Sequence, residues 1–290
     1  MTIGISVYNT SVRDLLQLSI VADEAGFDAV WLGEHVVAPL TYTTSHPMTG
    51  TTGYQHISGP LVKPETELVD PWAALGAVAG ATRRLRVATG ITVLPFRHPL
   101  LTARSAFTLQ EASEGRLVLG VGAGWLPEEF AALGVPFDER YSRFRETIEI
   151  LRTAWAGTPF DHRGKHFTID SVQLSTRAVH IPIILGGNAP GALRRAAALG
   201  DGWFSAAAPT LEDACRLRDE LLRLREENGR HEPFPCYFRI AANDPDLVDR
   251  YRREGIDDVI IWDDHVWPTS GTFESKRAAM LASADDLGLR

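Results

Sequence analysis

The feature that most constrains the fold is a regular alternation of short apolar runs with longer segments of helical periodicity. Runs such as 29–32 and 181–185 are apolar at consecutive positions, which is typical of parallel strands covered on both faces. Residues 12–25, by contrast, place apolar side chains on one helical stripe and end at Gly26, a residue suited to the position after a helix. The alternation predicts a parallel sheet whose strands are joined by crossover helices.

The number of these units favours a barrel. We expect strands at 2–8, 28–32, 85–91, 116–122, 181–185, 202–205, 236–240 and 258–262. We expect helices at 12–25, 71–82, 100–113, 138–155, 190–199, 211–228 and 245–254. Eight strands with crossover helices predict an α/β fold, a single (β/α)8 TIM barrel domain spanning residues 1–290. A doubly wound open sheet is the alternative, but it usually needs fewer strands, and no GxGxxG motif follows the first strand.

Two connections are longer than the rest. Residues 36–69 are rich in Thr, Gly, His and Pro and show no periodicity. They follow a strand, so in a barrel they lie at the C-terminal face, where active sites occur, and we interpret them as a lid rather than an inert insertion. Residues 156–180 contain a hairpin pattern around 162–165.

Composition argues against several classes of function. The formal net charge of −8 argues against broad nucleic-acid binding, which needs a basic surface. No apolar run approaches the roughly 18 residues of a membrane helix, and the first residues do not resemble a secretory signal. The two cysteines, Cys215 and Cys236, form no CxxC pair, and the nine histidines form no HExxH or other metal motif. We therefore expect a cytoplasmic protein that binds a small molecule and has no metal site, nucleic-acid partner or membrane partner.

Two titratable residues, Glu34 and His35, directly follow the strand 28–32. A neutral imidazole donates or accepts a proton near neutral pH, and a neighbouring carboxylate raises its pKa or fixes its tautomer. A histidine that merely bonds a backbone carbonyl at the strand end is the alternative. Because the pair precedes the lid-like segment at the predicted barrel mouth, we favour a catalytic role.

Glycines mark three further strand ends. Gly90 lies inside the strand 85–91, where it indicates either a close approach of a ligand or a β-bulge. In 120–125, glycines at every second position leave one strand face bare, which suits either a flat ring or close helix packing. Residues 186–188, Gly-Gly-Asn, lead into a helix whose free N–H groups suit a phosphate.

Two nearby features complete this region. Arg194 or Arg195 could add positive charge beside the Gly-Gly-Asn segment. The segment 199–203, Leu-Gly-Asp-Gly-Trp, is interpreted as a tight turn with a structural role.

Four segments occur in a recognisable order: GFDAVWLGEH (26–35), LRVATGITVLP (85–95), GRLVLGVGAGW (115–125) and GGNAPGALRRAAALGDGW (186–203). With them the chain resembles the bacterial luciferase-like flavin and deazaflavin superfamily, over roughly residues 1–240. It is most similar to coenzyme F420-dependent oxidoreductases of actinobacterial type. The resemblance implies a TIM barrel with a cofactor ring at its C-terminal mouth. It also implies hydride transfer between deazaflavin C5 and a small organic substrate, and a homodimer.

The resemblance also implies roles for individual residues. The catalytic pair would be His35, which donates or accepts a proton, and Glu34, which contacts the ring or its chain. A bulged third strand with a non-prolyl cis peptide at Gly90–Ile91 would support the ring. The cofactor-binding set is then Thr89, Gly90, Ile91 and Gly122 around the ring, with Gly186, Gly187 and Asn188 at the phosphate.

One position departs from the family pattern. Some members carry an acid after the Gly-x-Gly of the fourth strand, where this chain has Trp125. Sugar-phosphate oxidation is therefore not expected, and an aromatic wall suits a flatter or more apolar substrate. Two alternatives stay open: an FMN-dependent monooxygenase, and a barrel that binds a flavin or deazaflavin without turnover.

Overall fold

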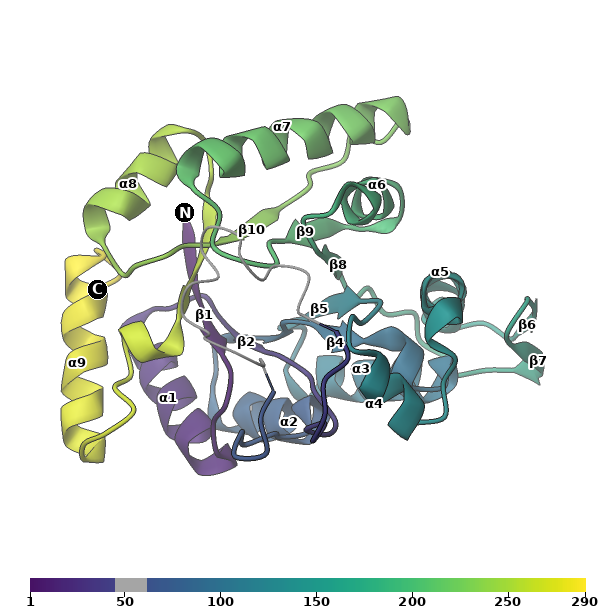
Figure 1. The fold of residues 1–290 in the computed structure, drawn as a ribbon, viewed down its shortest axis with the longest axis horizontal. Coiled ribbons are helices and arrows are strands. Elements are labelled where there is room, and N and C mark those ends of the chain that lie inside the picture. The colour runs from purple at the N-terminus through teal and green to yellow at the C-terminus, as the bar shows by residue number, and fades with distance from the viewer. Residues whose placement is uncertain (45–61) are drawn as a thin grey trace.

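A closed ring of parallel strands lies at the centre of the molecule in a computed structural model, which describes residues 1–44 and 62–290 (Figure 1). The strands of the ring are β1 (Thr2–Val7), β2 (Ala29–Leu32), β3 (Arg86–Thr89), β4 (Thr92–Val93), β5 (Leu117–Gly122), β8 (Ile183–Gly186), β9 (Gly202–Phe204), β10 (Cys236–Arg239) and β11 (Asp258–Trp262). Each strand pairs in parallel with its neighbours, and pairing of β3 with β5 closes the ring. Because β4 continues the course of β3, the ring is an eight-stranded barrel, which confirms the predicted fold and excludes the open sheet.

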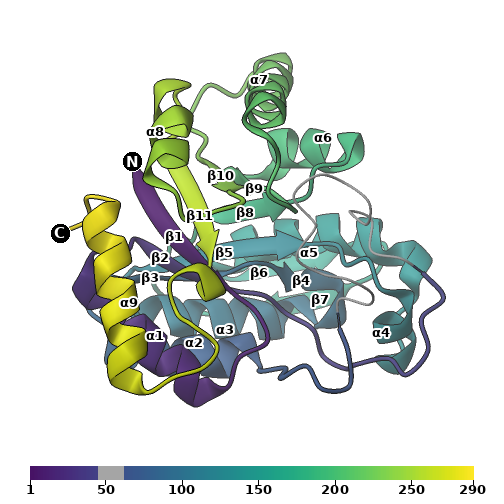
Figure 2. The same ribbon diagram turned by 60° about the vertical axis from the view of Figure 1, so that its left-hand side comes forward.

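Helices cover the outside of the ring (Figure 2). They are α1 (Val12–Ala25), α2 (Pro71–Ala81), α3 (Pro99–Ala112), α4 (Pro127–Ala132), α5 (Arg140–Ala154), α6 (Pro190–Leu199), α7 (Leu211–Glu227), α8 (Pro245–Arg253) and α9 (Phe273–Asp286). Every predicted helix and strand is present, with ends within two residues of the expected ones. Local signals account for this agreement: the Ser11 hydroxyl caps α1, and Gly26 ends it with φ of 88°.

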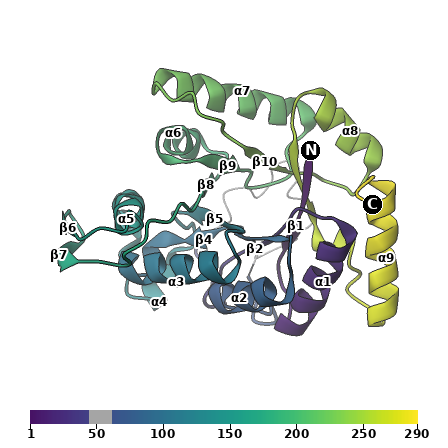
Figure 3. The same cartoon turned by 180° about the vertical axis from the view of Figure 1, so that it is seen from behind.

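The sequence-based prediction missed the last helix, α9. Its buried side chains are Lys276, Met280, Ser283 and Ala284, most of them polar or small, so no apolar stripe marks the helix. It packs beside α1 (Figure 3). The Lys276 ammonium of α9 lies 3.0 Å from a carboxylate oxygen of Asp14 in α1.

The hairpin expected around 162–165 is also present. Strands β6 (Phe160–Arg163) and β7 (Thr168–Val172) pair antiparallel and extend beyond α5, away from the barrel (Figure 1). The Glu146 carboxylate of α5 holds the hairpin, since it accepts from the backbone N–H groups of His166 and Phe167.

The inside of the barrel is filled by side chains. Trp31 stacks on Phe204 with ring centroids 4.8 Å apart, and Tyr237 lies 4.8 Å from Trp31 on another side. The remaining members of this inner cluster are Ala29, Ala88, Val118, Ile184 and Ile260. The barrel is therefore a packed core, and binding sites must lie at its ends.

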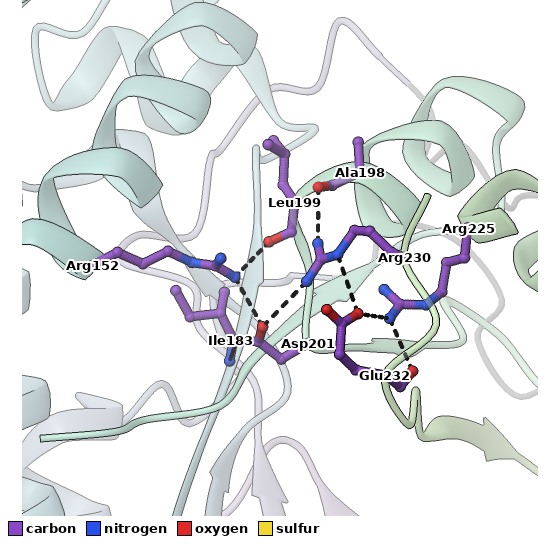
Figure 4. Close-up of polar contacts among 8 residues, drawn as sticks. All are labelled: Arg152, Ile183, Ala198, Leu199, Asp201, Arg225, Arg230 and Glu232. Atoms are coloured by element: carbon purple, nitrogen blue, oxygen red, sulfur yellow. Dashed lines mark hydrogen bonds and ion pairs between the residues drawn. The ribbon is translucent and has the colours of Figure 1, made fainter. Parts of the chain in front are cut away.

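At the N-terminal end of the barrel, the turn 199–203 is tied down by Asp201 (Figure 4). One carboxylate oxygen accepts from the Ile183 N–H at 3.0 Å, and the other lies 3.0 Å from Arg152 and 3.8 Å from Arg230. The turn thus joins two strands to α5 and to the segment after α7. These contacts support the structural interpretation of this turn.

The predicted lid, 36–69, is described only at its two ends, because residues 45–61 lie outside the described residues. In the first end, Thr43 donates to the Glu128 carboxylate of α4 from its N–H at 2.6 Å and from its hydroxyl at 2.7 Å. The lid interpretation stays a prediction. Within residues 1–44 and 62–290, no helix is long and apolar enough to cross a membrane.

Candidate active site

His35 lies just beyond the C-terminal end of β2, and its ring is held by a buried carboxylate. Its Nδ1 is 2.8 Å from Oε2 of Glu129, whose side chain is 2% exposed. The other oxygen of Glu129 accepts from the Val36 N–H at 2.7 Å. Glu129 belongs to the first turn of α4, the helix that follows β5.

Sequence reasoning did not identify Glu129 as a partner of His35. The two residues are 94 positions apart. The only signal was that both follow barrel strands, so both belong to the C-terminal face. Which of the groups on that face meet depends on the geometry of the closed ring.

Two aromatic rings flank His35. Tyr8, beyond the end of β1, and Trp125, beyond the end of β5, each meet it edge-on with centroids 6.2 Å away. His35 and Tyr8 also line a small cavity together with Gly33. The aromatic wall predicted at Trp125 therefore lies directly beside the candidate catalytic histidine.

Glu34 makes a different set of contacts from its neighbour. Its side chain is 1% exposed, one oxygen accepts from the Val93 N–H at 2.7 Å, and the other pairs with Arg97. Arg97 also lies 3.3 Å from Asp70, the residue that caps α2. Burial raises the pKa of the Glu34 carboxyl, against the opposing effects of the Arg97 guanidinium and the Val93 N–H. Both oxygens of Glu34 are thus engaged in joining β2 to β4.

The third barrel strand is interrupted between β3 and β4, where the Gly90–Ile91 peptide bond is cis, as predicted. The Gly90 N–H donates to the Leu32 carbonyl at 2.8 Å. The buried Thr89 hydroxyl donates to the Gly120 carbonyl at 2.6 Å. These bonds anchor the interrupted segment to both neighbouring strands.

The bare glycine face of β5 receives this interrupted segment. A Cβ at Gly120 would lie 1.9 Å from the Thr89 carbonyl oxygen, and one at Gly122 would lie 2.5 Å from Cδ1 of Ile91. The Ile91 side chain also reaches Gly186, where a Cβ would lie 3.1 Å from its Cγ2. The glycines therefore serve close packing within the barrel. A direct role of Gly122 toward a cofactor ring stays a prediction.

The Gly-Gly-Asn segment links β8 to α6. Gly187 has φ of 116°, which favours glycine, and the Asn188 side-chain oxygen accepts from the Ala206 N–H at 2.9 Å. Ala189, which precedes α6, provides no side-chain cap, so the first turn of α6 has no side-chain acceptor at that position.

Arginines gather at this helix terminus. A Cβ at Gly191 would meet Arg195 Nη1 at 3.4 Å and Arg194 Nη2 at 4.0 Å, so both guanidinium groups reach back to the first turn of α6. Burial lowers the pKa of Arg195, and the positive charges of Arg140, Arg145 and Arg194 lower it further. Like charges gathered at the positive end of a helix dipole suit an anion, and a cofactor phosphate fits this donor set.

Arg239, the last residue of β10, is a second basic group that sequence reasoning missed. Its guanidinium lies between the rings of Phe204 and Trp262, at 4.4 and 4.6 Å from their centroids. It also lies 3.4 Å from the Gly90 carbonyl oxygen and 3.1 Å from the Ser6 hydroxyl. The sequence signal that could have identified Arg239 is an arginine at the end of an otherwise apolar strand. Arg239 places positive charge against the interrupted third strand.

The chain is similar to several known proteins. An uncharacterized protein of Mycobacterium tuberculosis is 34% identical over 248 residues, which cover 85% of this chain and 83% of that protein. The F420-dependent glucose-6-phosphate dehydrogenase of Beutenbergia cavernae is 32% identical over 197 residues, which cover 66% of this chain but only 52% of that enzyme.

Solved structures share the fold at lower identity. Monooxygenase RslO1 from Streptomyces bottropensis superposes with a TM-score of 0.76 at 22% identity, over 99% of this chain and 98% of that one. The coenzyme F420-dependent tetrahydromethanopterin reductase from Methanopyrus kandleri gives 0.72 at 17% identity, over 97% of each chain. The sequence model of the luciferase-like monooxygenase family matches residues 2–259, which include His35, Glu129 and the Gly-Gly-Asn segment, and the chain belongs to that family.

Proposed function

We propose that this chain is an F420-dependent oxidoreductase that transfers a hydride between deazaflavin C5 and a small organic substrate. The observation that carries the proposal is the presence of two groups at the same end of the barrel. His35, an acid–base group, follows β2, and the arginine-rich terminus of α6 follows β8. The relatives named as F420-dependent dehydrogenases favour F420 over FMN, whereas the structural neighbours bear on the fold alone.

The residues at β8 and α6 bind the anionic part of the cofactor. The phosphate lies beside Gly186, Gly187 and Asn188 at the start of α6, and Arg194 and Arg195 supply the counter-charge. The interrupted strand, Thr89 to Ile91, with Gly122 beneath Ile91, supports the ring. When bound, F420 accepts or supplies a hydride at C5.

His35 moves the proton that accompanies the hydride. Reduction of a carbonyl leaves negative charge on the substrate oxygen, and an imidazole beside it donates a proton; in the oxidative direction the imidazole accepts one. Glu34 is assigned a positioning role, because the Val93 N–H and Arg97 already engage its two oxygens. Trp125 and Tyr8 favour a flat or apolar substrate.

The cofactor assignment is tested by titrating the purified protein with F420 and with FMN, following tryptophan fluorescence. We expect tighter binding of F420. Tighter binding of FMN together with substrate-dependent oxygen uptake would instead identify a monooxygenase.

The role of His35 is tested by His35→Ala, with the exposed His231→Ala as a matched control. With F420 and a panel of enones, ketones and alcohols, we expect His35→Ala to lose at least about 100-fold in kcat, the scale of general acid–base catalysis. His231→Ala should behave as wild type. Full activity of His35→Ala would contradict the role of His35, and absence of turnover with every substrate would favour a barrel that only binds the cofactor.

Two further proposals concern the assembly and the location of the protein. We propose a homodimer, which light scattering on the purified protein tests directly. We also propose a cytoplasmic location, which fractionation of the native host tests.

A further inference from the structure

We propose that Glu129 is a positioning residue that holds neutral His35 in the tautomer protonated at Nδ1, so that Nε2 is the nitrogen that exchanges a proton with the substrate. The statement about the substrate rests on the proposed function. The statement about the tautomer concerns only the protein and can be tested without cofactor.

The hydrogen bonds of Glu129 determine which ring nitrogen carries the proton. An ionised carboxylate can only accept hydrogen bonds, so the ring nitrogen 2.8 Å from Oε2 must be an N–H. The second oxygen accepts from the Val36 N–H at 2.7 Å and lies 3.5 Å from the Val37 nitrogen. With side-chain exposures of 10% for His35 and 2% for Glu129, little water competes for these bonds.

Packing around the His35 ring prevents a ring flip that would exchange the positions of Nδ1 and Nε2. Tyr8 and Trp125 meet His35 edge-on from two sides. Among the residues that the structure describes, no side chain or backbone group forms a hydrogen bond with Nε2 of His35. Since His35 also lines the cavity at the barrel mouth, Nε2 is the nitrogen left for a ligand.

The neighbouring glutamate provides a matched control. Glu128 lies in the same helical turn, but its carboxylate bonds the N–H and hydroxyl of Thr43 instead of His35. A Glu-to-Gln change at either position removes one charge from the same turn of α4. Only the change at Glu129 alters the group that faces the imidazole.

Glu129→Gln should invert the tautomer. The Val36 N–H needs an acceptor, so the carbonyl oxygen of the new amide takes that position and its NH2 group faces Nδ1. An NH2 group donates, so Nδ1 must then present its lone pair and the proton moves to Nε2. The substitution keeps the shape of the side chain, which preserves the packing of α4.

The test is a 15N–1H correlation spectrum of histidine-labelled protein without cofactor, at about pH 9, where an ordinary imidazole is neutral. His35→Gln assigns the signals. We expect the Nδ1–H tautomer in wild type and in Glu128→Gln, and the Nε2–H tautomer in Glu129→Gln. An Nε2–H tautomer in wild type, or an unchanged tautomer in Glu129→Gln, would overturn the inference.

Kinetics extend the test to the proposed reaction. Glu129→Gln should lower kcat by about 100-fold with an unchanged Kd for F420, because only the proton step is affected. Glu128→Gln should stay within about threefold of wild type. If no F420-dependent turnover exists at all, the proposed function fails, whereas the tautomer measurement still decides the role of Glu129.

Discussion

Gly120→Ala should destabilise the barrel strongly, because the added methyl group collides with a neighbouring strand. A Cβ at Gly120 would lie 1.9 Å from the carbonyl oxygen of Thr89. An ordinary carbon–oxygen contact is about 3.3 Å, so the two atoms must separate by about 1.4 Å. The atom that must move belongs to the backbone of β3, so no side-chain rotation can relieve the contact.

The cost follows from what that displacement breaks. Overpacking of a core costs about 1–3 kcal/mol. Moving the Thr89 carbonyl also disturbs the bond from the Thr89 hydroxyl to the Gly120 carbonyl and the pairing of β3 with β5, at about 1 kcal/mol for each bond lost. Together these losses are about 2–5 kcal/mol, a large part of the stability of an ordinary domain.

Urea unfolding followed by tryptophan fluorescence measures this loss as a lower midpoint at unchanged slope. Gly76→Ala is the control, because Gly76 lies inside α2 with nothing within 4 Å of an added Cβ, so we expect stabilisation by about 0.5–1 kcal/mol. Gly122→Ala should cost less than Gly120→Ala, because it meets only the end of the Ile91 side chain. A Gly120→Ala protein within about 0.5 kcal/mol of wild type would refute this account of how β3 and β5 meet.

Three further predictions concern charged groups away from His35. Asp201→Ala removes the acceptor of the Ile183 N–H, so the free energy of unfolding should fall by about 1–3 kcal/mol. The Kd for F420, measured by fluorescence titration, should stay unchanged, because the site lies at the other end of the barrel. Arg195→Gln should raise that Kd by about tenfold at low salt and by less at high salt, without loss of stability; an unchanged Kd at both ionic strengths would argue against a phosphate site at α6. Burial, with the neighbouring Asp264 carboxylate, raises the pKa of Asp263 to about 7, so the folded chain retains a proton that the unfolded chain releases from about pH 4 upward. The stability due to this proton is complete below about pH 4 and is lost as the pH rises through 7, so Asp263→Asn should raise the urea midpoint at pH 8 but not at pH 4.

Local periodicity and turn residues were enough to predict the barrel. The spacing of apolar residues and the glycine after α1 act over a few positions, so they are visible in the chain before it folds. The helix α9 was missed because this local signal is absent there: its buried residues are mostly small or polar and form no apolar stripe. The order of strands then followed from the preference for crossover connections between neighbouring parallel strands.

The partners within the candidate site depended on the closed ring. The pairs His35 with Glu129, Glu34 with Arg97, and Arg239 with the Gly90 carbonyl join residues 94, 63 and 149 positions apart. Sequence motifs predicted that polar groups would gather at the C-terminal face, because every parallel strand ends there. Glu34 is bound within the barrel wall, whereas the adjacent His35 lines the cavity. This difference depends on the direction in which each side chain points where β2 ends. That direction is decided by the neighbouring strands and by α4, which come from elsewhere in the chain.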